Sequence, residues 1–202
     1  MIHVKSGNIT LSLISHRDVE QMCIWRNLEH VKTQMRFKEI ITLNQQKIWF
    51  ESLNQQMNLY FKIVINNESI GIVNLKDIDW KERKAEAGVF IGETNFLETA
   101  TPITSVLVMM RFAFESLAMN CLYATVSRFN TNAIKFNLAL GYKLIESRED
   151  EFDYYSCSLE SFESSDVSNK LSSSSNIEVQ IDKGSEWILS YCNTSSKGFH
   201  FG

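Results

Sequence analysis

The sequence is poor in the residues that mark metal and redox sites. Its four cysteines, Cys23, Cys121, Cys157 and Cys192, lie far apart, with no close pair of the kind that holds zinc or forms a redox motif. The four histidines are equally scattered, without the i, i+4 spacing that places two ligands on one helix face. We therefore expect reduced, partly buried thiols and no metal site.

The sequence also lacks an excess of positive charge and a long hydrophobic run. Its 20 Lys and Arg are outnumbered by 24 Asp and Glu, and the two signs are interleaved, so no basic face selects a nucleic acid. The most apolar run, residues 106–110, ends at Arg111, and residues 1–7 have neither the basic nor the apolar region of a signal peptide. We expect a cytoplasmic protein without a membrane span and without a nucleic-acid partner.

With one proline in 202 residues, most of the chain alternates between helical and strand periodicity. Capping boxes begin two helices, at Ser15 and at Thr42, and the pair Thr101-Pro102 begins a third. These elements predict one α/β domain over residues 1–160. The predicted strands are residues 8–14, 59–65, 70–75, 85–91, 121–127, 142–147 and 152–159, and the predicted helices are residues 15–27, 42–53, 101–117 and 132–140.

The last part of the sequence has a different composition. Serine and acidic residues dominate residues 161–176, which is typical of a flexible linker. Residues 177–181 and 187–191 predict a hairpin within an extension over residues 177–202. A hairpin alone is marginally stable in water, so we expect it to pack on the domain, to pair with a second copy in a homodimer, or to be disordered.

Several segments, taken in order and with their spacing, resemble one family of enzymes. They are Trp25-Arg26-Asn27 and residues 49–53, 70–75, 77–79, 85–92 and 130–142. Together they resemble the GNAT superfamily of N-acetyltransferases, in particular its branch of ribosomal-protein and sugar-nucleotide amine N-acyltransferases. The resemblance implies the GNAT fold, an α/β (α+β) arrangement with a mixed, mostly antiparallel sheet of about seven strands, about four helices, and the hairpin as an extension.

The resemblance implies acetyl-CoA or another short acyl-CoA as donor, and no metal. The helix that begins at Thr101 would hold the CoA pyrophosphate, because unpaired N–H groups and the helix dipole attract anions. The family usually has glycines and a basic residue in the turn before this helix, but residues 96–102 contain neither, and Glu98 would repel phosphate. The alternative is that Thr101-Pro102 only begins a helix. The residues assigned to the phosphates are Thr99, Ala100, Thr101, Ile103 and Thr104.

The strand that contains Gly88 would hold the thioester. In the family, a bulge in this strand frees backbone N–H groups for the thioester carbonyl, and Gly88 occupies the matching position. The resemblance therefore assigns the backbone of Val89, Phe90 and Ile91 to the donor, and Asn130 to its pantetheine arm. The residues alone equally allow a plain core strand and, for Asn130, a helix N-cap.

Two residues are candidates for proton transfer. Glu86 lies two residues before Gly88 and so points to the same face of the strand, where it could deprotonate the amine directly or through water. An ordinary surface glutamate is the alternative. Many relatives have a tyrosine that protonates the thiolate where this sequence has Asn137, whose amide can donate a hydrogen bond to sulfur but is no general acid. The thiolate can also leave into water.

The acceptor site is expected between the first predicted helix, the loop over residues 29–41 and the end of the strand near residue 79. Two tryptophans there could stack on a base or a sugar face, and two arginines could bind a diphosphate. The residues assigned to the acceptor are Trp25, Arg26, Asn27, Arg36, Asp79 and Trp80.

These residues favour an N-acyltransferase that acts on the amine of a nucleotide-linked amino sugar, a dTDP- or UDP-amino-dideoxy sugar used in polysaccharide biosynthesis. The donor would be acetyl-CoA or a short hydroxyacyl-CoA, and transfer would be direct, through a tetrahedral intermediate. Two alternatives remain. One is an acetyltransferase for protein N-termini or polyamines, which needs an acidic groove. The other is a non-catalytic binding module with the same fold, which the missing glycines suggest.

Overall fold

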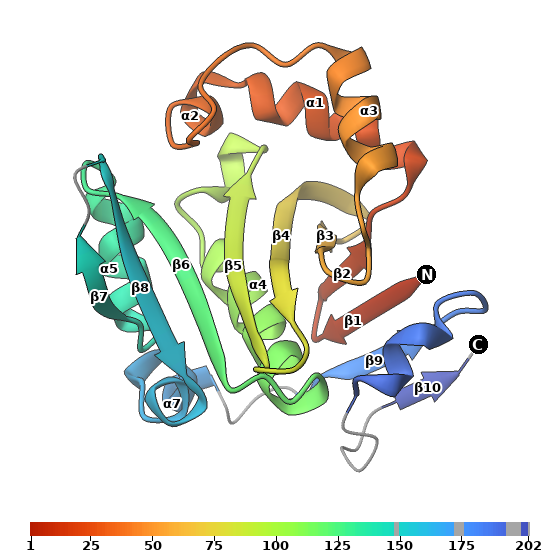
Figure 1. The fold of residues 1–202 in the computed structure, drawn as a ribbon, viewed down its shortest axis with the longest axis vertical. Helices are drawn as coiled ribbons and strands as arrows, with labels where there is room; N and C mark the ends of the chain where they lie inside the picture. Colours follow the sequence, from red (N-terminus) through yellow and green to blue (C-terminus); the bar gives the residue numbers. More distant parts are fainter. Residues whose placement is uncertain (148–149, 172–175, 193–198, 202) are drawn as a thin grey trace.

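A computed structural model describes residues 1–147, 150–171, 176–192 and 199–201. Within these residues, the strands form one ten-stranded sheet in the order β10-β9-β1-β2-β3-β4-β5-β6-β8-β7 (Figure 1). The strands are β1 Ile2–Ser6, β2 Ile9–Leu13, β3 Leu59–Ile65, β4 Glu68–Asp79, β5 Lys84–Ile91, β6 Cys121–Ser127, β7 Lys143–Ser147, β8 Phe152–Ser158, β9 Glu178–Ile181 and β10 Phe199–Phe201. The helices are α1 Val19–Asn27, α2 Glu29–Lys32, α3 Leu43–Ser52, α4 Thr101–Arg111, α5 Thr131–Ala139, α6 Leu159–Glu163 and α7 Asp166–Leu171. The α/β class and the mixed, mostly antiparallel sheet are confirmed.

Local sequence explains where the helices begin. In the capping box of α3, Thr42 Oγ1 accepts the N–H of Gln45 at 3.2 Å, and Gln45 Oε1 accepts the N–H of Thr42 at 2.8 Å. Pro102 stands in the first turn of α4, where a missing N–H costs no helical hydrogen bond. The predicted helix over residues 101–117 is α4 followed by a π-helical turn, Phe112–Ser116. No helix in the described ranges is long and apolar enough to cross a membrane.

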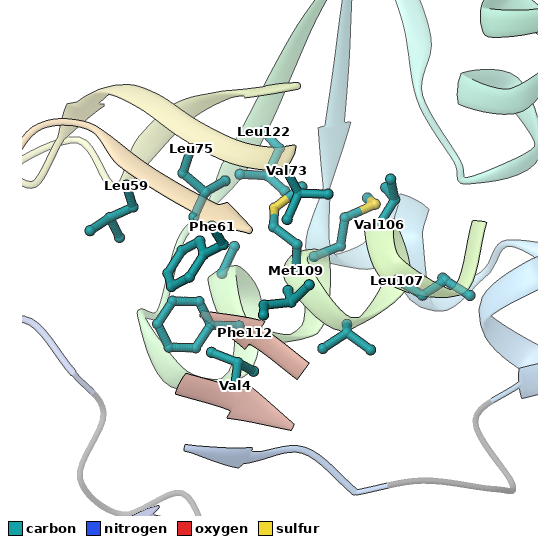
Figure 2. Close-up of a cluster of buried hydrophobic side chains, with 14 of the residues drawn as sticks. Val4, Leu59, Phe61, Val73, Leu75, Val106, Leu107, Met109, Phe112 and Leu122 are labelled. Carbon is teal, nitrogen blue, oxygen red and sulfur yellow. The ribbon is translucent and has the colours of Figure 1, made fainter. Parts of the chain in front are cut away.

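The main core lies between α4 and one face of the sheet. Figure 2 shows Val106, Met109 and Phe112 gathered with the strand residues Phe61 and Leu75. The rings of Phe61 and Phe112 are fully buried and meet edge-on, with their centroids 5.7 Å apart. Burial of an apolar side chain of this kind stabilises the fold by roughly 1.5–3 kcal/mol. The core therefore fixes α4 against the strands, including β4, which carries part of the functional site.

Strands β5 and β6 are parallel neighbours over one end of their length. Their pairing ends with Glu86 opposite Tyr123. Beyond this pair the two strands separate, as Figure 1 shows, while β5 stays paired with β4 as far as Ile91. Among the described residues, one edge of β5 therefore has no strand partner from Ala87 onward. Apart from the carbonyl oxygen of Ile91, which lies 3.0 Å from His30 Nε2, its backbone groups on that edge are available to a ligand.

The sheet extends further at the N-terminal side than the sequence analysis predicts. Residues 2–6 form β1, which turns into β2 through Gly7 at φ +58°. The segment has period-two alternation, and its apolar residues Ile2 and Val4 are fully buried. The predicted strand over residues 8–14 is confirmed as β2.

The predicted C-terminal hairpin is wrong. Strand β9 pairs antiparallel with β1 and parallel with β10, and residues 186–190 form a 3-10 turn where the second strand of the hairpin was expected. The edge of β1 offers unpaired backbone groups, and pairing there buries Val179 and Ile181 in the main core. Residues 193–198 and 202 lie outside the described residues.

The linker prediction for residues 161–176 is also wrong where the structure describes it, because this segment contains the end of α6 and all of α7. Its serines act locally: Ser165 Oγ accepts the N–H of Ser168 at 3.2 Å, as a helix cap does. Phe162 is buried and stacks on a ring of the π-helical turn. Residues 172–175 lie outside the described residues.

Candidate active site

A cleft of about 520 Å³ lies where β5 and β6 separate. Its walls are residues 86–91 of β5, residues 124–127 of β6 and one face of α5, and α4 contributes Val106 and Met109. The first helices and the segment that follows α2 supply the remaining wall. Tyr60 of β3, Lys76 of β4 and Phe152 of β8 also line it, so the cleft combines an open strand edge with groups from most of the elements around it.

The donor-binding backbone predicted at Val89, Phe90 and Ile91 lines this cleft. The expected bulge at Gly88 is wrong, because Gly88 pairs with Asn74 in continuous register. A Cβ atom at Gly88 would lie 2.8 Å from Asn74 Oδ1, so the glycine permits the close approach of that side chain. The strand edge is freed by the separation of β5 from β6 and needs no bulge.

Glu86 lines the cleft and is held by a lysine on the neighbouring strand. Its Oε1 lies 3.1 Å from Lys76 Nζ, and the two residues are register partners in the β4–β5 pair. The glutamate side chain is 26% exposed, so it is reachable from the cleft. A carboxylate within reach of the acceptor can take a proton from its ammonium group.

Asn130 and Asn137 both line the cleft and both also serve α5. Asn130 Oδ1 accepts the N–H of Ala133 at 2.9 Å, which makes it the N-cap of the helix. Asn137 Nδ2 donates to the carbonyl oxygen of Ala133 at 2.8 Å. That bond uses one of the two N–H groups of the Asn137 amide, and the other remains available for a ligand.

The residues predicted to bind phosphate lie at the start of α4, and none of them is among the described residues that line the cleft. Two of their three hydroxyl groups are already committed. Thr99 Oγ1 donates to the carbonyl oxygen of Phe96, and Thr104 Oγ1 donates to that of Ala100, both at 2.8 Å. The backbone N–H of Thr101 donates to Thr99 Oγ1 at 3.2 Å. These two side chains therefore stabilise the turn. The N–H of Thr104 also donates to the carbonyl oxygen of Ala100, at 3.0 Å, so few N–H groups in the first turn of α4 are left for an anion.

Trp25, predicted to stack on the acceptor, lies in the core. It is 1% exposed, and its Nε1 donates to Glu93 Oε1 at 2.8 Å. Gly92 packs so tightly on the indole that a Cβ there would come within 2.0 Å of the ring. The prediction for Trp25 is therefore wrong, because this ring fills the space under α1 and cannot meet a ligand.

Asn27 fixes the segment that precedes α3 and is not among the residues that line the cleft. Its Nδ2 donates to the carbonyl oxygen of Ile41 at 2.7 Å, and its Oδ1 accepts the N–H of Ile41 at 2.8 Å. Both ends of the amide are thus occupied by the backbone. A role in acceptor binding is contradicted, since these two bonds leave the side chain facing the loop.

Asp79 and Trp80 lie at the far end of β4, away from the residues that line the cleft. Trp80 stacks on Tyr191 with ring centroids 4.1 Å apart and donates to the carbonyl oxygen of Gln56 at 2.7 Å. Asp79 Oδ1 accepts the N–H groups of residues 81 and 82, both at 2.9 Å, and so caps a turn. Their assignment to the acceptor is wrong, because Tyr191 of the C-terminal segment covers one face of the Trp80 ring and the Asp79 carboxylate is used by the turn.

The two arginines of the acceptor prediction do line the cleft, in different states. Arg36 lies on the rim, where Nη1 is 3.4 Å from Asp150 Oδ2 and Nη2 donates to Tyr154 Oη at 2.5 Å. Arg26 is partly buried, and its Nε has no hydrogen-bond partner among the described residues. Burial lowers the pKa of the Arg26 guanidinium, and the electrostatic effects of Tyr60 and Cys23 only partly offset it.

The polar residues of the cleft that the sequence analysis missed include His30, Tyr60, Lys76 and Tyr142. His30 Nε2 lies 3.0 Å from the carbonyl oxygen of Ile91, so this nitrogen carries the proton and ties α2 to the end of β5. Burial raises the pKa of both Tyr60 and Tyr142, which keeps their hydroxyl groups protonated. Lys76 could have been found from the β4–β5 register, but nothing local marks the other three.

No group of three or more His, Cys, Asp or Glu side chains in the described part of the chain is arranged to hold a metal ion. The polar groups of the cleft include the Glu86 carboxylate, the Lys76 ammonium group, the Arg26 guanidinium and the open edge of β5. A carboxylate beside free backbone N–H groups suits removal of a proton from a nucleophile and stabilisation of an oxyanion.

Comparisons with known proteins agree with this geometry. The family model of the acetyltransferase (GNAT) domain matches residues 11–156. A search of curated protein sequences gives no match. Among solved structures, the chain resembles a spermidine N-acetyltransferase from Vibrio cholerae in complex with CoA and spermine, with a TM-score of 0.68 and 14% identity over 77% of this chain and 98% of that one.

Two further solved structures have the same fold. FdhC, described as a nucleotide-linked sugar GNAT in its apo form, has a TM-score of 0.68 and 22% identity over 80% of this chain and 92% of its own. An aminoglycoside acetyltransferase in complex with coenzyme A has a TM-score of 0.66 and 18% identity over 77% and 97% of the two chains. With the family match over residues 11–156, the chain belongs to the GNAT acetyltransferase family and is an acyl-CoA-dependent N-acyltransferase.

Proposed function

We propose that the protein transfers a short acyl group from acyl-CoA to the amine of a nucleotide-linked amino sugar. The observation that carries the proposal is the state of Arg26, a partly buried guanidinium whose Nε has no partner among the described residues. A buried charge without a counter-ion is costly, so a site that keeps one is suited to a ligand that brings the counter-ion. The diphosphate of a sugar nucleotide is such a group, and a guanidinium binds it in two-pronged geometry.

The charges of the cleft support an anionic acceptor. Glu86 is the one carboxylate among the described residues that line it, and Lys76 neutralises that carboxylate at 3.1 Å. Arg36 is matched by Asp150 on the rim. No carboxylate among the lining residues neutralises the positive charge of Arg26. The electrostatic potential in the cleft therefore favours an anionic acceptor and disfavours a polyamine or another cationic one.

The chemistry follows from the positions of these groups. Glu86 takes a proton from the acceptor ammonium group, directly or through water, and frees the amine for attack on the thioester carbon. Backbone N–H groups on the open edge of β5, from Val89 to Ile91, stabilise the oxyanion of the tetrahedral intermediate. The C–S bond of the intermediate then breaks, the nitrogen gives up its remaining extra proton to water or to the departing sulfur, and CoA leaves with a hydrogen bond from Asn137 or into water. Acetyl-CoA and short hydroxyacyl-CoA are the proposed donors.

The proposal predicts which amines are substrates. Acyl transfer from acetyl-CoA is measured with a dTDP- or UDP-linked amino sugar, with the same amino sugar lacking the nucleotide, and with spermidine. The nucleotide-linked sugar should be acylated, and removal of the nucleotide should lower kcat/KM by at least about tenfold, because the diphosphate is the group bound by Arg26. Acylation of spermidine in preference to the nucleotide-linked sugar would overturn the proposal and leave the family assignment intact.

A further inference from the structure

One large aromatic side chain stands exposed beside the cleft. Phe129, in the turn between β6 and α5, is 80% exposed. Ser127 and Asn130, on either side of it in the sequence, line the cleft, so this turn lies at the edge of the cleft. A single exposed aromatic ring is common on a protein surface, but one carried by a turn at the edge of a ligand cleft can serve as a flat apolar platform.

The turn that carries Phe129 is held in place. The N–H of Asn130 donates to the carbonyl oxygen of Ser127 at 2.9 Å, and the N–H of Phe129 donates to Ser127 Oγ at 3.3 Å. Arg128 Nε donates to Asp153 Oδ1 at 2.8 Å, which ties the turn to β8. The ring is therefore presented by an ordered backbone, and binding there costs little ordering entropy.

The donor needs a contact of this kind because the segment before α4 offers little to its phosphates. Residues 92–101 contain no Lys or Arg and do contain Glu93 and Glu98. The hydroxyl groups of Thr99 and Thr104 already donate to backbone carbonyls. Leu97, which is 44% exposed, supplies an apolar group to the cleft from the same segment.

We propose that Phe129 is the stacking platform for the adenine of acyl-CoA. Asn130, which the family resemblance assigns to the pantetheine arm, lines the cleft and directly follows Phe129 in the sequence. Every base has a π-face, and stacking on an aromatic side chain accounts for about fivefold to a hundredfold in affinity. In this protein the base, more than the phosphates, anchors the nucleotide half of the donor. The inference concerns the donor alone and does not depend on which amine is the acceptor.

The test compares a donor with its nucleotide and one without it. Dissociation constants of acetyl-CoA and of acetyl-pantetheine, which lacks the nucleotide, are measured by NMR titration for the wild type and for Phe129→Ala. The substitution should weaken acetyl-CoA binding about tenfold and leave acetyl-pantetheine binding unchanged. Phe129→Trp should retain the affinity, and Phe129→Leu should fall between. Leu144→Ala, which alters a side chain 52% exposed on β7, is the matched control.

Three results would overturn the proposal. If Phe129→Ala weakened the binding of acetyl-CoA and of acetyl-pantetheine equally, the substitution would have altered the cleft and not a contact with the base. An unchanged dissociation constant for acetyl-CoA would show that the ring is not contacted. Failure of the wild type to bind acetyl-CoA would show that the protein does not bind the proposed donor. A thermal melt of each variant shows whether the fold is retained.

Discussion

The two sides of the cleft use different physical means. The proposed acceptor side, formed by Arg26, Tyr60, Lys76 and Glu86, concentrates charge in a partly buried setting, where the Nε of the guanidinium has no partner among the described residues. The proposed donor side, formed by Leu97, Ser127, Asn130 and the nearby Phe129, has no Lys or Arg in its first segment and presents apolar and backbone groups. If both proposals hold, the acceptor is selected by electrostatics and the donor by shape and stacking.

The largest effect is expected from removal of the proton acceptor. Glu86→Gln should lower kcat by about 10²–10⁴-fold, because it keeps the size of the side chain and removes its basicity. Initial rates with saturating acetyl-CoA measure this. Glu82→Gln, which removes a carboxylate also paired with a lysine but outside the cleft, should leave the rate unchanged. A Glu86→Gln variant with the wild-type rate would exclude this residue as the base.

Loss of the acceptor-side charge should come next. Arg26→Gln should raise the KM of a nucleotide-linked amino sugar at least about 30-fold, the smallest loss expected when one partner of a buried charge pair is removed. Binding of acetyl-CoA should change little, since the donor is held on the other side. Arg17→Gln, an exposed arginine outside the described lining of the cleft, is the matched control. If both substitutions changed the KM of the acceptor equally, the effect would be general surface charge.

The core position of Trp25 makes a stability prediction of intermediate size. Trp25→Phe leaves a small cavity and removes the partner of Glu93, so the free energy of unfolding should fall by about 1–3 kcal/mol. Urea denaturation measures it. The KM of the acceptor should be unchanged at a temperature where the variant is folded. A raised KM of the acceptor with an unchanged free energy of unfolding would show instead that Trp25 contacts the acceptor.

A smaller, pH-dependent effect is expected at Asp18, which supports the helices of the acceptor side. Burial alone would raise its pKa, but hydrogen bonds from Lys62 and Ser15 outweigh burial and hold the pKa below the ordinary value. The folded state therefore gains stability from Asp18 above the unfolded pKa, and this gain is lost as the pH falls through the folded pKa. Asp18→Asn should cost about 1–2 kcal/mol at neutral pH.

Urea denaturation of wild type and Asp18→Asn over a pH series measures the difference. The two free energies of unfolding should converge as the pH falls into the acidic range where the carboxyl group is protonated in both states. A difference that stays constant with pH would mean that the variant disturbs packing and not the ionised pair.

The smallest effect should come from the segment before α4. Thr104→Val removes a hydroxyl group that donates to the carbonyl oxygen of Ala100, so the dissociation constant of acetyl-CoA should change by less than about threefold. Calorimetric titration checks this. A loss of about tenfold or more would show that the hydroxyl turns toward phosphate in the complex, and would weaken the contrast between the two sides.

Much of the fold follows from local patterns, and the failures have identifiable causes. Period-two alternation and capping residues predicted β2 through β8 and the larger helices. The serine-rich composition after residue 160 predicts a linker, but Ser165 caps helix α7. Phe162, in the preceding helix α6, is buried. Residues 187–191 have the composition of a strand, but β9 pairs with β1 instead of with this segment, so the predicted hairpin does not form.

Whether a residue faces the cleft could be predicted from the sequence where the geometry of one strand determines it. It could not be predicted where contacts between distant segments determine it. Glu86 faces the cleft because of its position on β5, and Arg26 because α1 packs over the same end of the sheet. Trp25, one residue earlier on α1, is buried through Gly92 and Glu93, which no local pattern connects with it. Trp80 is covered by Tyr191 in the same way.

The most direct test of electrostatic selection on the acceptor side is equilibrium binding of a free nucleoside diphosphate, dTDP or UDP, to the protein saturated with CoA. Calorimetric titration of the wild type should show binding that weakens at least about tenfold in Arg26→Gln and that falls with added salt, because the guanidinium supplies the counter-charge. Spermidine should not bind. Binding of spermidine to the wild type, with no binding of either nucleoside diphosphate, would contradict the account.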